Sequence, residues 1–208
     1  SGRAAAQCFR RRDAIVTVTD LRPPAAFDRE LRGLMAQQIG LELGVHREET
    51  FLRQDLIVIS PGVFPEPPAL AAARERKVPV VSEVEAAGWF LGPKIIGVTG
   101  SNGKTTVTAL LGKMLAASGF QTFVGGNIGV PLISAVDAVS REAFIVAELS
   151  SFQLEAIREF RPHVAVLLNL TPNHLDRHPT FQGYVRAKAQ IFRNQTPDDF
   201  AVLNADDA

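Results

Sequence analysis

Residues 95–106 form the segment that most restricts how this chain can fold. Their sequence, Ile-Ile-Gly-Val-Thr-Gly-Ser-Asn-Gly-Lys-Thr-Thr, passes from an apolar run into a glycine-bearing loop and then into a helical pattern that opens at Lys104. Glycine lets backbone N–H groups approach and surround phosphate oxygens, and the start of the following helix adds partial positive charge. The segment therefore predicts a strand, a phosphate-binding loop and a helix in immediate succession.

The residue types of this loop indicate what it binds. Lys104 can reach the β- and γ-phosphates of ATP, and the Thr105 hydroxyl can ligate Mg²⁺. The general pattern G-x-x-x-x-G-K-[ST] has a glycine where this chain has Val98, so the loop departs from that pattern. The alternative is a plain Gly-Asn turn between strand and helix, which would need no lysine. We predict an ATP site formed by Gly100, Ser101, Asn102, Gly103, Lys104, Thr105 and Thr106.

Short β-branched runs alternate with helical patterns over the whole chain, which is typical of parallel α/β architecture. The expected strands are Ala14–Asp20, Asp55–Ser60, Pro79–Ser82, Lys94–Thr99, Gln121–Val124, Phe144–Leu149, Val164–Asn169 and Phe200–Leu203. The expected helices are Ala4–Arg12, Phe27–Gln38, Ala69–Arg76, Glu83–Phe90, Lys104–Ser118, Ser151–Phe160 and Tyr184–Asn194. The predicted fold class is α/β, with two doubly wound parallel-sheet units.

The tripeptide Leu91-Gly92-Pro93 is the best candidate for a domain boundary, because a helical pattern ends there and a strand follows at once. Residues 1–92 would form a Rossmann-like domain, and residues 93–208 a P-loop central domain. We expect the first strand of the first domain, and the last part of the second, to lie outside this sequence.

Composition excludes several classes of protein. The chain has 22 Lys and Arg against 22 Asp and Glu, so no overall field attracts nucleic acid or an anionic membrane. No apolar run approaches the roughly 20 residues that span a bilayer. A single cysteine, Cys8, excludes internal disulfides and a multi-cysteine zinc site. We expect a soluble, cytoplasmic protein that binds neither nucleic acid nor membrane.

Three later segments add to the phosphate loop. They are Gly-Gly-Asn-Ile-Gly at 125–129, Glu-Leu-Ser-Ser-Phe-Gln-Leu at 148–154 and Asn-Leu-Thr-Pro-Asn-His-Leu-Asp-Arg-His at 169–178. With the loop Thr-Gly-Ser-Asn-Gly-Lys-Thr-Thr, they resemble in order and spacing the motifs of the muramyl ligase family, whose relatives include folylpolyglutamate synthase. The resemblance covers essentially the whole chain. The second segment is similar to that of the family's D-glutamate-adding members.

This resemblance implies an ATP-dependent amide ligase of peptidoglycan synthesis that adds D-glutamate to UDP-N-acetylmuramoyl-L-alanine. The γ-phosphoryl group of ATP would move to the carboxylate of the muramoyl substrate, and the amine of D-glutamate would attack the resulting acyl phosphate. Lys104, His174 and Lys188 are the predicted catalytic residues. The full-length enzyme would be a monomer. We expect this chain alone to be inactive, because the family's third domain, which carries the amino-acid site, lies outside it.

Two side chains are candidate magnesium ligands beside Thr105. Glu148 ends an apolar strand, where a carboxylate next to a phosphate loop is placed to hold Mg²⁺; the alternative is a solvated or helix-capping glutamate. By resemblance, Glu148 and Thr105 hold the magnesium that bridges the nucleotide phosphates. His174 alone would be an ordinary surface histidine. By resemblance it is a ligand of a second magnesium, although Asn173 stands where the family often has an acid.

Lys188 lies on a largely apolar helix, from which a lysine usually extends its ammonium to solvent. By resemblance it reacts with CO₂ and, as a carbamate, becomes a ligand of the second metal; burial would lower its pKa and free the amine for this reaction. Asn127, Ser150 and Gln153 have an ordinary interpretation as turn and capping residues. By resemblance they contact the muramoyl substrate or its transferring phosphate.

The first domain carries weaker signals. Asp20 ends a predicted strand, where an acid in dinucleotide-binding folds hydrogen-bonds a ribose; the alternative is a helix N-cap. By resemblance, Asp20 and Arg22 lie near the uracil of the substrate, and Ser1 and Gly2 end the loop that holds its diphosphate. Residues 60–63, Ser-Pro-Gly-Val, form another loop similar to one in the family, or a simple turn.

Other functions stay open at this point. The chain could belong to another amide ligase of the superfamily, such as one that extends folate. It could be a nucleotide-binding module without amide chemistry, which would need Thr105 and Glu148 but not His174 or Lys188. A nicotinamide-dependent oxidoreductase is disfavoured because the first domain lacks a complete glycine motif.

Overall fold

The computed structural model describes residues 1–208 except 62, 64–65, 93, 174–176 and 208, and it leaves the side chains at 28–31 undescribed. Contacts divide the chain into two compact units, Ser1–Glu83 and Val84–Ala208. Every paired strand in the described residues is parallel, which confirms the predicted α/β class. The boundary after Gly92 stays a prediction. No helix in the described ranges is long and apolar enough to cross a membrane.

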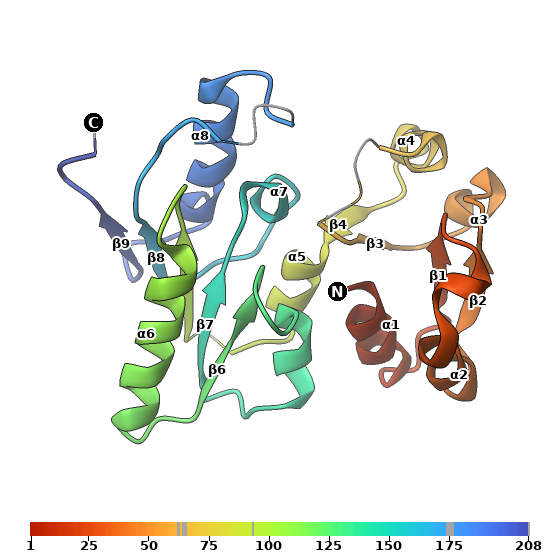
Figure 1. The fold of residues 1–208 in the computed structure, drawn as a ribbon, viewed down its shortest axis with the longest axis horizontal. Coiled ribbons are helices and arrows are strands. Elements are labelled where there is room, and N and C mark those ends of the chain that lie inside the picture. Colours follow the sequence, from red (N-terminus) through yellow and green to blue (C-terminus); the bar gives the residue numbers. More distant parts are fainter. Residues whose placement is uncertain (62, 64–65, 93, 174–176, 208) are drawn as a thin grey trace. The chain divides into compact units, whose positions relative to one another are not determined.

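The first unit pairs its strands as two parallel ribbons (Figure 1). Strand β1 (Thr17–Asp20) lies beside β2 (Gly40–Leu43), and β3 (Ile57–Ile59) lies beside β4 (Val80–Ser82). Helical segments connect them: α1 (Gly2–Arg10), η1 (Pro24–Ala26), α2 (Asp28–Ala36), α3 (Glu48–Leu52) and α4 (Pro68–Glu75). Each ribbon has its own small core, one around Ala6, Leu34 and Ile39 and one around Phe51, Leu70, Ala73 and Val80.

The second unit is built on a five-stranded parallel sheet in the order β6-β7-β5-β8-β9 (Figure 1). Its strands are β5 (Ile95–Thr99), β6 (Thr122–Gly126), β7 (Phe144–Glu148), β8 (Val164–Leu167) and β9 (Phe200–Leu203). The chain leaves the central strand β5 toward one edge, returns through β7 and then continues on the other side through β8. The carboxyl ends of β7, β5 and β8 are therefore neighbours at the point where the winding reverses, which is where open α/β sheets bind ligands.

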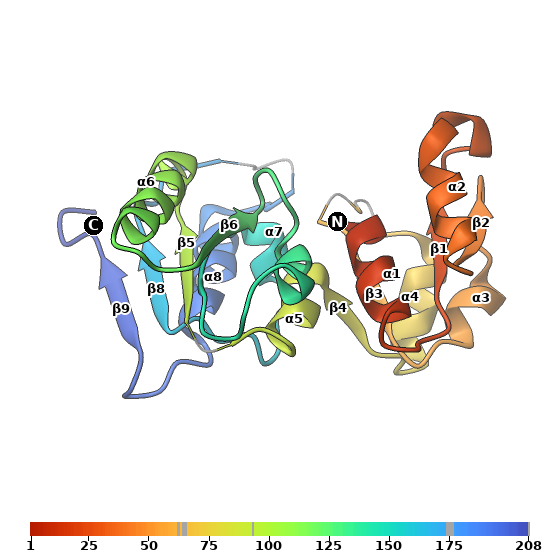
Figure 2. The same ribbon diagram turned by 90° about the horizontal axis from the view of Figure 1, so that it is seen from below.

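Helices cover both faces of this sheet (Figures 1 and 2). On one face, Val107, Leu111 and Leu115 of α6 (Lys104–Ala117) pack against a buried row formed by Val98, Val146 and Val166. Adjacent strand residues point to opposite faces, so Gly97 faces the other side, where Ile191 of η3 (Gln190–Phe192) approaches it. Helix α8 (Phe181–Ala189) leads directly into η3. The remaining helical segments of this unit are α5 (Glu83–Gly88), η2 (Leu132–Asp137) and α7 (Ser151–Leu154).

Helix α7 is shorter than the predicted span Ser151–Phe160, which is a correction. The helix ends at Leu154, and a few residues later three backbone N–H groups of the predicted span bond to a side chain instead of to helix carbonyls. The buried carboxylate of Glu85 accepts hydrogen bonds from the N–H groups of Arg158, Glu159 and Phe160 at 2.8–2.9 Å. An ionised carboxylate is a stronger acceptor than a helix carbonyl, so the chain turns toward it.

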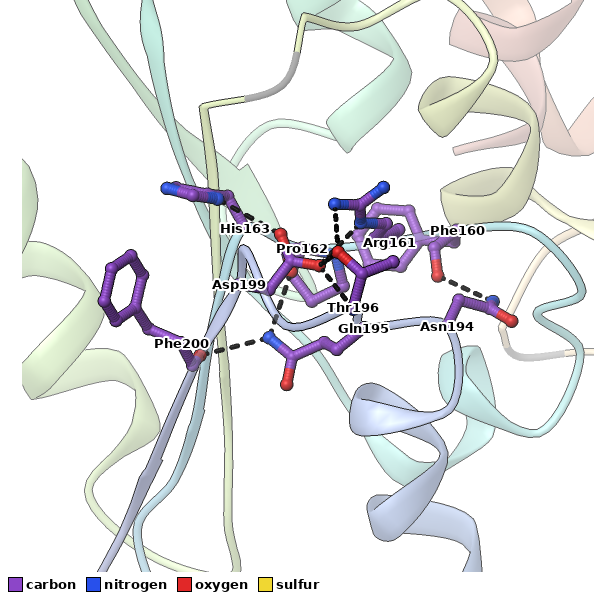
Figure 3. Close-up of polar contacts among 9 residues, drawn as sticks. All are labelled: Phe160, Arg161, Pro162, His163, Asn194, Gln195, Thr196, Asp199 and Phe200. Atoms are coloured by element: carbon purple, nitrogen blue, oxygen red, sulfur yellow. Dashed lines mark hydrogen bonds and ion pairs between the residues drawn. The ribbon is translucent and has the colours of Figure 1, made fainter.

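A polar cluster joins the amino-terminal ends of β8 and β9 (Figure 3). Asp199, whose side chain is 2% exposed, accepts from Arg161 Nε at 2.6 Å and from the backbone N–H of Thr196 at 2.8 Å. His163 Nδ1 lies 3.1 Å from the same carboxyl group. The Arg161 guanidinium is the main cause of the lowered pKa of Asp199. The cluster fixes the two strand starts at the end of the sheet opposite the phosphate loop.

Candidate functional site

The predicted phosphate loop lies at the carboxyl end of β5, between the ends of β7 and β8. Gly100 adopts φ +149°, and a β-carbon there would lie 3.0 Å from Leu168 Cβ, so glycine is required for the close approach. The Lys104 ammonium folds back over the loop and donates to the carbonyl oxygens of Gly100 and Ser101, both at 3.0 Å. The first N–H groups of α6 have no acceptor within the helix, so they and the ammonium can face an anion.

The chain that follows β8 forms one wall of the loop. Asn169 O and Oδ1 accept from the N–H groups of Ser101 and Asn102, both at 2.9 Å, and Asn169 Nδ2 donates to Asn102 O at 3.1 Å. The Ser101 hydroxyl donates to Thr171 O at 2.9 Å and accepts from Thr171 N–H at 2.8 Å. These bonds fix the backbone of the loop against the chain that follows β8.

Glu148 stands directly beside the loop, as its position in the sequence predicted. The strand register places Glu148 opposite Val98, one residue before the end of β5. Its side chain is 2% exposed; Oε2 accepts from Thr105 Oγ1 and Oε1 from Asn127 Nδ2, each at 2.8 Å. Asn127 also donates its backbone N–H to Glu148 O at 2.8 Å. Gly126, at φ +105°, permits this approach, because a β-carbon there would overlap the Glu148 carbonyl oxygen.

The Thr105–Glu148 pair fits a magnesium ion. Mg²⁺ prefers oxygen ligands in octahedral geometry at about 2.1 Å, which places adjacent ligand oxygens about 3 Å apart. The oxygens of Thr105 and Glu148 are 2.8 Å apart and belong to the two ligand types that this ion takes beside nucleotide phosphates. These two residues could therefore hold the ion on the side of the loop away from Asn169.

Lys188 is buried in this site and does not extend to solvent. Its side chain is 2% exposed, Nζ lies 3.4 Å from Thr99 Oγ1, and the ammonium stands 4.7 Å from the centre of the Tyr184 ring. Burial, and then the positive charge of Lys104, lower the pKa of Lys188 from 10.5 to about 8, while Glu148 opposes the shift. At slightly alkaline pH a large share of this amine is therefore neutral and nucleophilic.

Tyr184 is a site residue that the sequence analysis did not identify. Its phenol oxygen lies 3.0 Å from Ser101 Oγ, which connects α8 to the phosphate loop, and burial raises the pKa of Tyr184. The spacing of the two residues could have indicated Tyr184, because it precedes Lys188 by four residues and the two side chains share one face of the helix. Thr99 was missed as well; its hydroxyl donates to Leu149 O at 2.8 Å and faces Lys188.

Ser150 and Gln153 form a capping box at the start of α7. The Gln153 N–H donates to Ser150 Oγ at 3.3 Å, and Gln153 Oε1 accepts from Ser150 N–H at 2.9 Å. Gln153 is buried and Ser150 partly exposed. Ser150 and Gln153 therefore cap the start of α7, which is the ordinary interpretation of these residues. Contact of either residue with a substrate stays a prediction.

His174, the predicted ligand of a second magnesium, lies outside the described residues. Among the residues that the structure does describe, no group of three or more His, Cys, Asp or Glu side chains could hold a metal. The second metal site therefore stays a prediction.

In the first unit, Asp20 and Arg22 form a pair at the end of β1. Asp20 accepts from the Arg22 backbone N–H at 2.9 Å and from Nε and Nη2 at 3.0 and 2.8 Å. Hydrogen bonding to Arg22 is the first cause of the lowered pKa of Asp20. Ser1, just before α1, donates from Oγ to Ser60 Oγ at 2.9 Å, which brings the residue 60 loop to Gly2. Contact of these residues with a UDP group stays a prediction.

Comparison with protein families gives two matches along the chain. Residues 98–208 match the family model described as Mur ligase middle domain, and residues 1–82 match Mur ligase MurD-like, N-terminal domain. The Thr105–Glu148 pair, Lys188 and Tyr184 all lie within the first of these ranges.

Curated relatives agree with these matches. A protein of Geobacter sp. (strain M21), named UDP-N-acetylmuramoylalanine–D-glutamate ligase, is 52% identical over 207 residues, covering 100% of this chain and 46% of the relative. A protein of the same name from Citrifermentans bemidjiense is 54% identical over 194 residues, covering 93% of this chain and 43% of the relative. The chain thus spans a little less than half the length of these relatives.

Solved structures share the fold at low sequence identity. UDP-N-acetylmuramate:L-alanyl-gamma-D-glutamyl-meso-diaminopimelate ligase from Neisseria meningitides matches with a TM-score of 0.63 at 18% identity, covering 98% of this chain and 68% of that one. UDP-N-acetylmuramate-alanine ligase MurC from Thermotoga maritima matches with a TM-score of 0.56 at 22% identity, covering 98% and 46%. At these identities the likeness concerns the arrangement of strands and helices.

Proposed function

The chain belongs to the Mur ligase family, and we propose that it supplies the nucleotide site of a cytoplasmic enzyme that joins D-glutamate to UDP-N-acetylmuramoyl-L-alanine with ATP. The observation that carries this proposal is the direct bond between Thr105 on the phosphate loop and the buried Glu148. The names of the curated relatives support the choice of amino acid and of sugar nucleotide.

The residues of the loop act on the phosphates of ATP by position and charge. The first N–H groups of α6 donate to phosphate oxygens, and Lys104 leaves its two loop carbonyls to neutralise charge on the β- and γ-phosphates. Thr105 and Glu148 hold the magnesium ion, which draws electron density from the transferring phosphoryl group when it is bound. The γ-phosphoryl group passes to the carboxylate of the muramoyl substrate, and the D-glutamate amine displaces phosphate from the acyl phosphate.

Lys188 supports ligase chemistry over a simple nucleotide-binding module. A module that only binds nucleotide has no use for a buried lysine with a lowered pKa at the back of the phosphate loop. In the proposed enzyme, the neutral amine of Lys188 would add to CO₂ and release a proton to solvent, and the resulting carbamate, with His174, would hold a second magnesium. Asn127, Ser150 and Gln153 contact the muramoyl substrate or its transferring phosphate, and Asp20, Arg22, Ser1 and Gly2 contact the UDP group.

The test uses a protein of the length of the curated relatives, which we expect to be a monomer. Amide formation is measured with ATP, UDP-N-acetylmuramoyl-L-alanine and D-glutamate, and the matched reactions replace D-glutamate by L-glutamate or the sugar nucleotide by a folate. We expect product only in the first reaction and none with Lys188→Ala. Nucleotide hydrolysis that is unaffected by the acceptor and by Lys188→Ala would instead support a nucleotide-binding module, and turnover of the folate would support the related ligase.

A further inference from the structure

His178 is a buried histidine that the proposed reaction does not use. It is 3% exposed, although it follows a polar segment of the chain. Nε2 lies 2.9 Å from Ser151 Oγ, and Nδ1 lies 3.4 Å from Glu155 Oε1. Each ring nitrogen therefore has a polar contact, Nε2 with the Ser151 hydroxyl and Nδ1 with the Glu155 carboxylate.

The ring of His178 packs between two helices. It stacks on Phe152 of α7, with centroids 5.4 Å apart and an interplanar angle of 13°, and meets the edge of Tyr184 of α8 at 5.4 Å and 65°. Tyr184 in turn contacts Ser101 of the phosphate loop. His178 is therefore in contact with the start of α7 on one side and, through one further residue, with the phosphate loop on the other.

The order of contacts, Ser151 to His178 to Glu155, is that of a serine-hydrolase triad. Burial argues against nucleophilic chemistry here, because Ser151 is 2% exposed and a substrate carbonyl could not reach its oxygen. The same contacts fix the orientation of the first turn of α7. Ser151 follows Ser150, the capping residue, and stands three residues after Glu148.

We propose that His178 is a positioning residue that holds the start of α7, and with it Ser150, in place beside the phosphate loop. The effect of His178 on catalysis rests on the proposed function, since only ligation requires the muramoyl site and the nucleotide site to be aligned. A displacement of the order of 1 Å between reacting groups lowers turnover by up to about 100-fold. Loss of the His178 contacts should therefore reduce turnover more than nucleotide binding.

Four substitutions separate positioning from general stability. His178→Phe keeps an aromatic ring but removes both polar contacts. His178→Gln removes the ring but supplies an amide group that can hydrogen-bond to Ser151. Ser151→Ala removes the partner hydroxyl. The control is His163→Phe, because His163 also pairs with a carboxylate, that of Asp199 at 3.1 Å, but lies at the opposite end of β8 from the phosphate loop.

The first measurement is amide hydrogen exchange of residues 153–155 in the 208-residue chain, where it needs no substrate. We expect exchange about tenfold faster in His178→Phe and in Ser151→Ala, a smaller effect in His178→Gln, and wild-type rates in His163→Phe. The double variant His178→Phe/Ser151→Ala should exchange no faster than His178→Phe, because each change removes the same contact between His178 and Ser151. Wild-type exchange in His178→Phe, or additive effects in the double variant, would overturn the proposal.

The second measurement is steady-state ligation by the complete protein. We expect kcat to fall about 10- to 100-fold in His178→Phe with the KM for ATP unchanged, most of it recovered in His178→Gln, and no loss in His163→Phe. Equal losses in His178→Phe and His163→Phe at equal melting temperature would reduce His178 to a stability residue. A wild-type protein without amide product would refute the proposed function, while the exchange measurement would still decide the positioning.

Discussion

Replacing Lys188 by methionine should make the protein more stable at neutral pH. Methionine has a similar length and no charge, so Lys188→Met fills the same space between Thr99 and the Tyr184 ring. The wild-type chain must keep an ammonium group in a position that is 2% exposed. The free energy of unfolding therefore includes a penalty that the variant lacks.

The lowered pKa sets the size of this penalty. The fall from 10.5 to about 8, at about 1.4 kcal/mol per pKa unit, corresponds to roughly 3 kcal/mol against the charged form in the folded state. The variant also loses the contacts of the ammonium with Thr99 and Tyr184, together worth about 1–2 kcal/mol. We expect a net gain of about 1–2 kcal/mol at pH 7.

The pH dependence identifies the cause. Below pH 8 the lysine is protonated in both the folded and the unfolded chain, so the full penalty applies. Between pH 8 and 10.5 the unfolded chain still binds a proton that the folded chain has released, so wild-type stability rises with pH. The advantage of the variant should then shrink by about 1.4 kcal/mol per pH unit above 8, which cancels or reverses it near pH 9.5.

Urea unfolding followed by tryptophan fluorescence measures this difference. Trp89 is the sole tryptophan of the chain and belongs to the same unit as Lys188, so its signal reports that unit. Carbonate-free buffer keeps the amine unmodified. The matched control is Lys113→Met, since Lys113 is exposed on α6. A Lys188→Met difference that stays constant from pH 7 to 9.5, as in the control, would refute the lowered pKa.

Three further perturbations test the site and its support. Glu148→Gln should abolish the tightening of nucleotide binding by Mg²⁺, measured by calorimetry, while Glu142→Gln, at an exposed ion pair, should leave it unchanged. Asp199→Asn should lower the free energy of unfolding by about 2–4 kcal/mol at pH 7, because Arg161 and His163 lose a buried anion. The pKa of Asp199 is lowered in the folded chain, so below about pH 4 the unfolded chain binds a proton that the folded chain does not. Wild-type stability therefore falls with pH in that range, and the difference from the variant should shrink. Gly126→Ala should reduce the melting temperature and weaken Mg²⁺-dependent binding more than Gly119→Ala, because both glycines have positive φ but only Gly126 has the Glu148 carbonyl in the way.

The sequence predicted the second unit better than the first. The strands β5 to β9 were all expected, because each is a β-branched or apolar run with a turn signal on either side. The strand β2 was missed, since Gly-Leu-Glu-Leu contains no β-branched residue and becomes a strand only through its pairing with β1. The end of α7 could not be read locally, because the acceptor that draws the chain away is Glu85, far earlier in the sequence.

Part of the candidate site could likewise be predicted from the sequence, and part could not. The meeting of Thr105 and Glu148 could be predicted, since both follow or end neighbouring parallel strands whose carboxyl ends share one edge. The contacts of Tyr184 and His178 could not, because they depend on how α8 lies against the sheet and on side-chain packing between helices. Helical periodicity gives the face that Tyr184 and Lys188 share but not what that face meets.

Lys188 shows why this missing information matters for function. Read locally, a lysine on an apolar helix sends its ammonium to water and contributes little. The structure instead buries it beside the phosphate loop, where the ammonium contacts Thr99 and the Tyr184 ring and Lys104 adds repulsion. An apolar side chain would fold more easily at this position, so stability does not explain the lysine. What remains is its chemistry, since the features that oppose the charged form are those that free the amine to react.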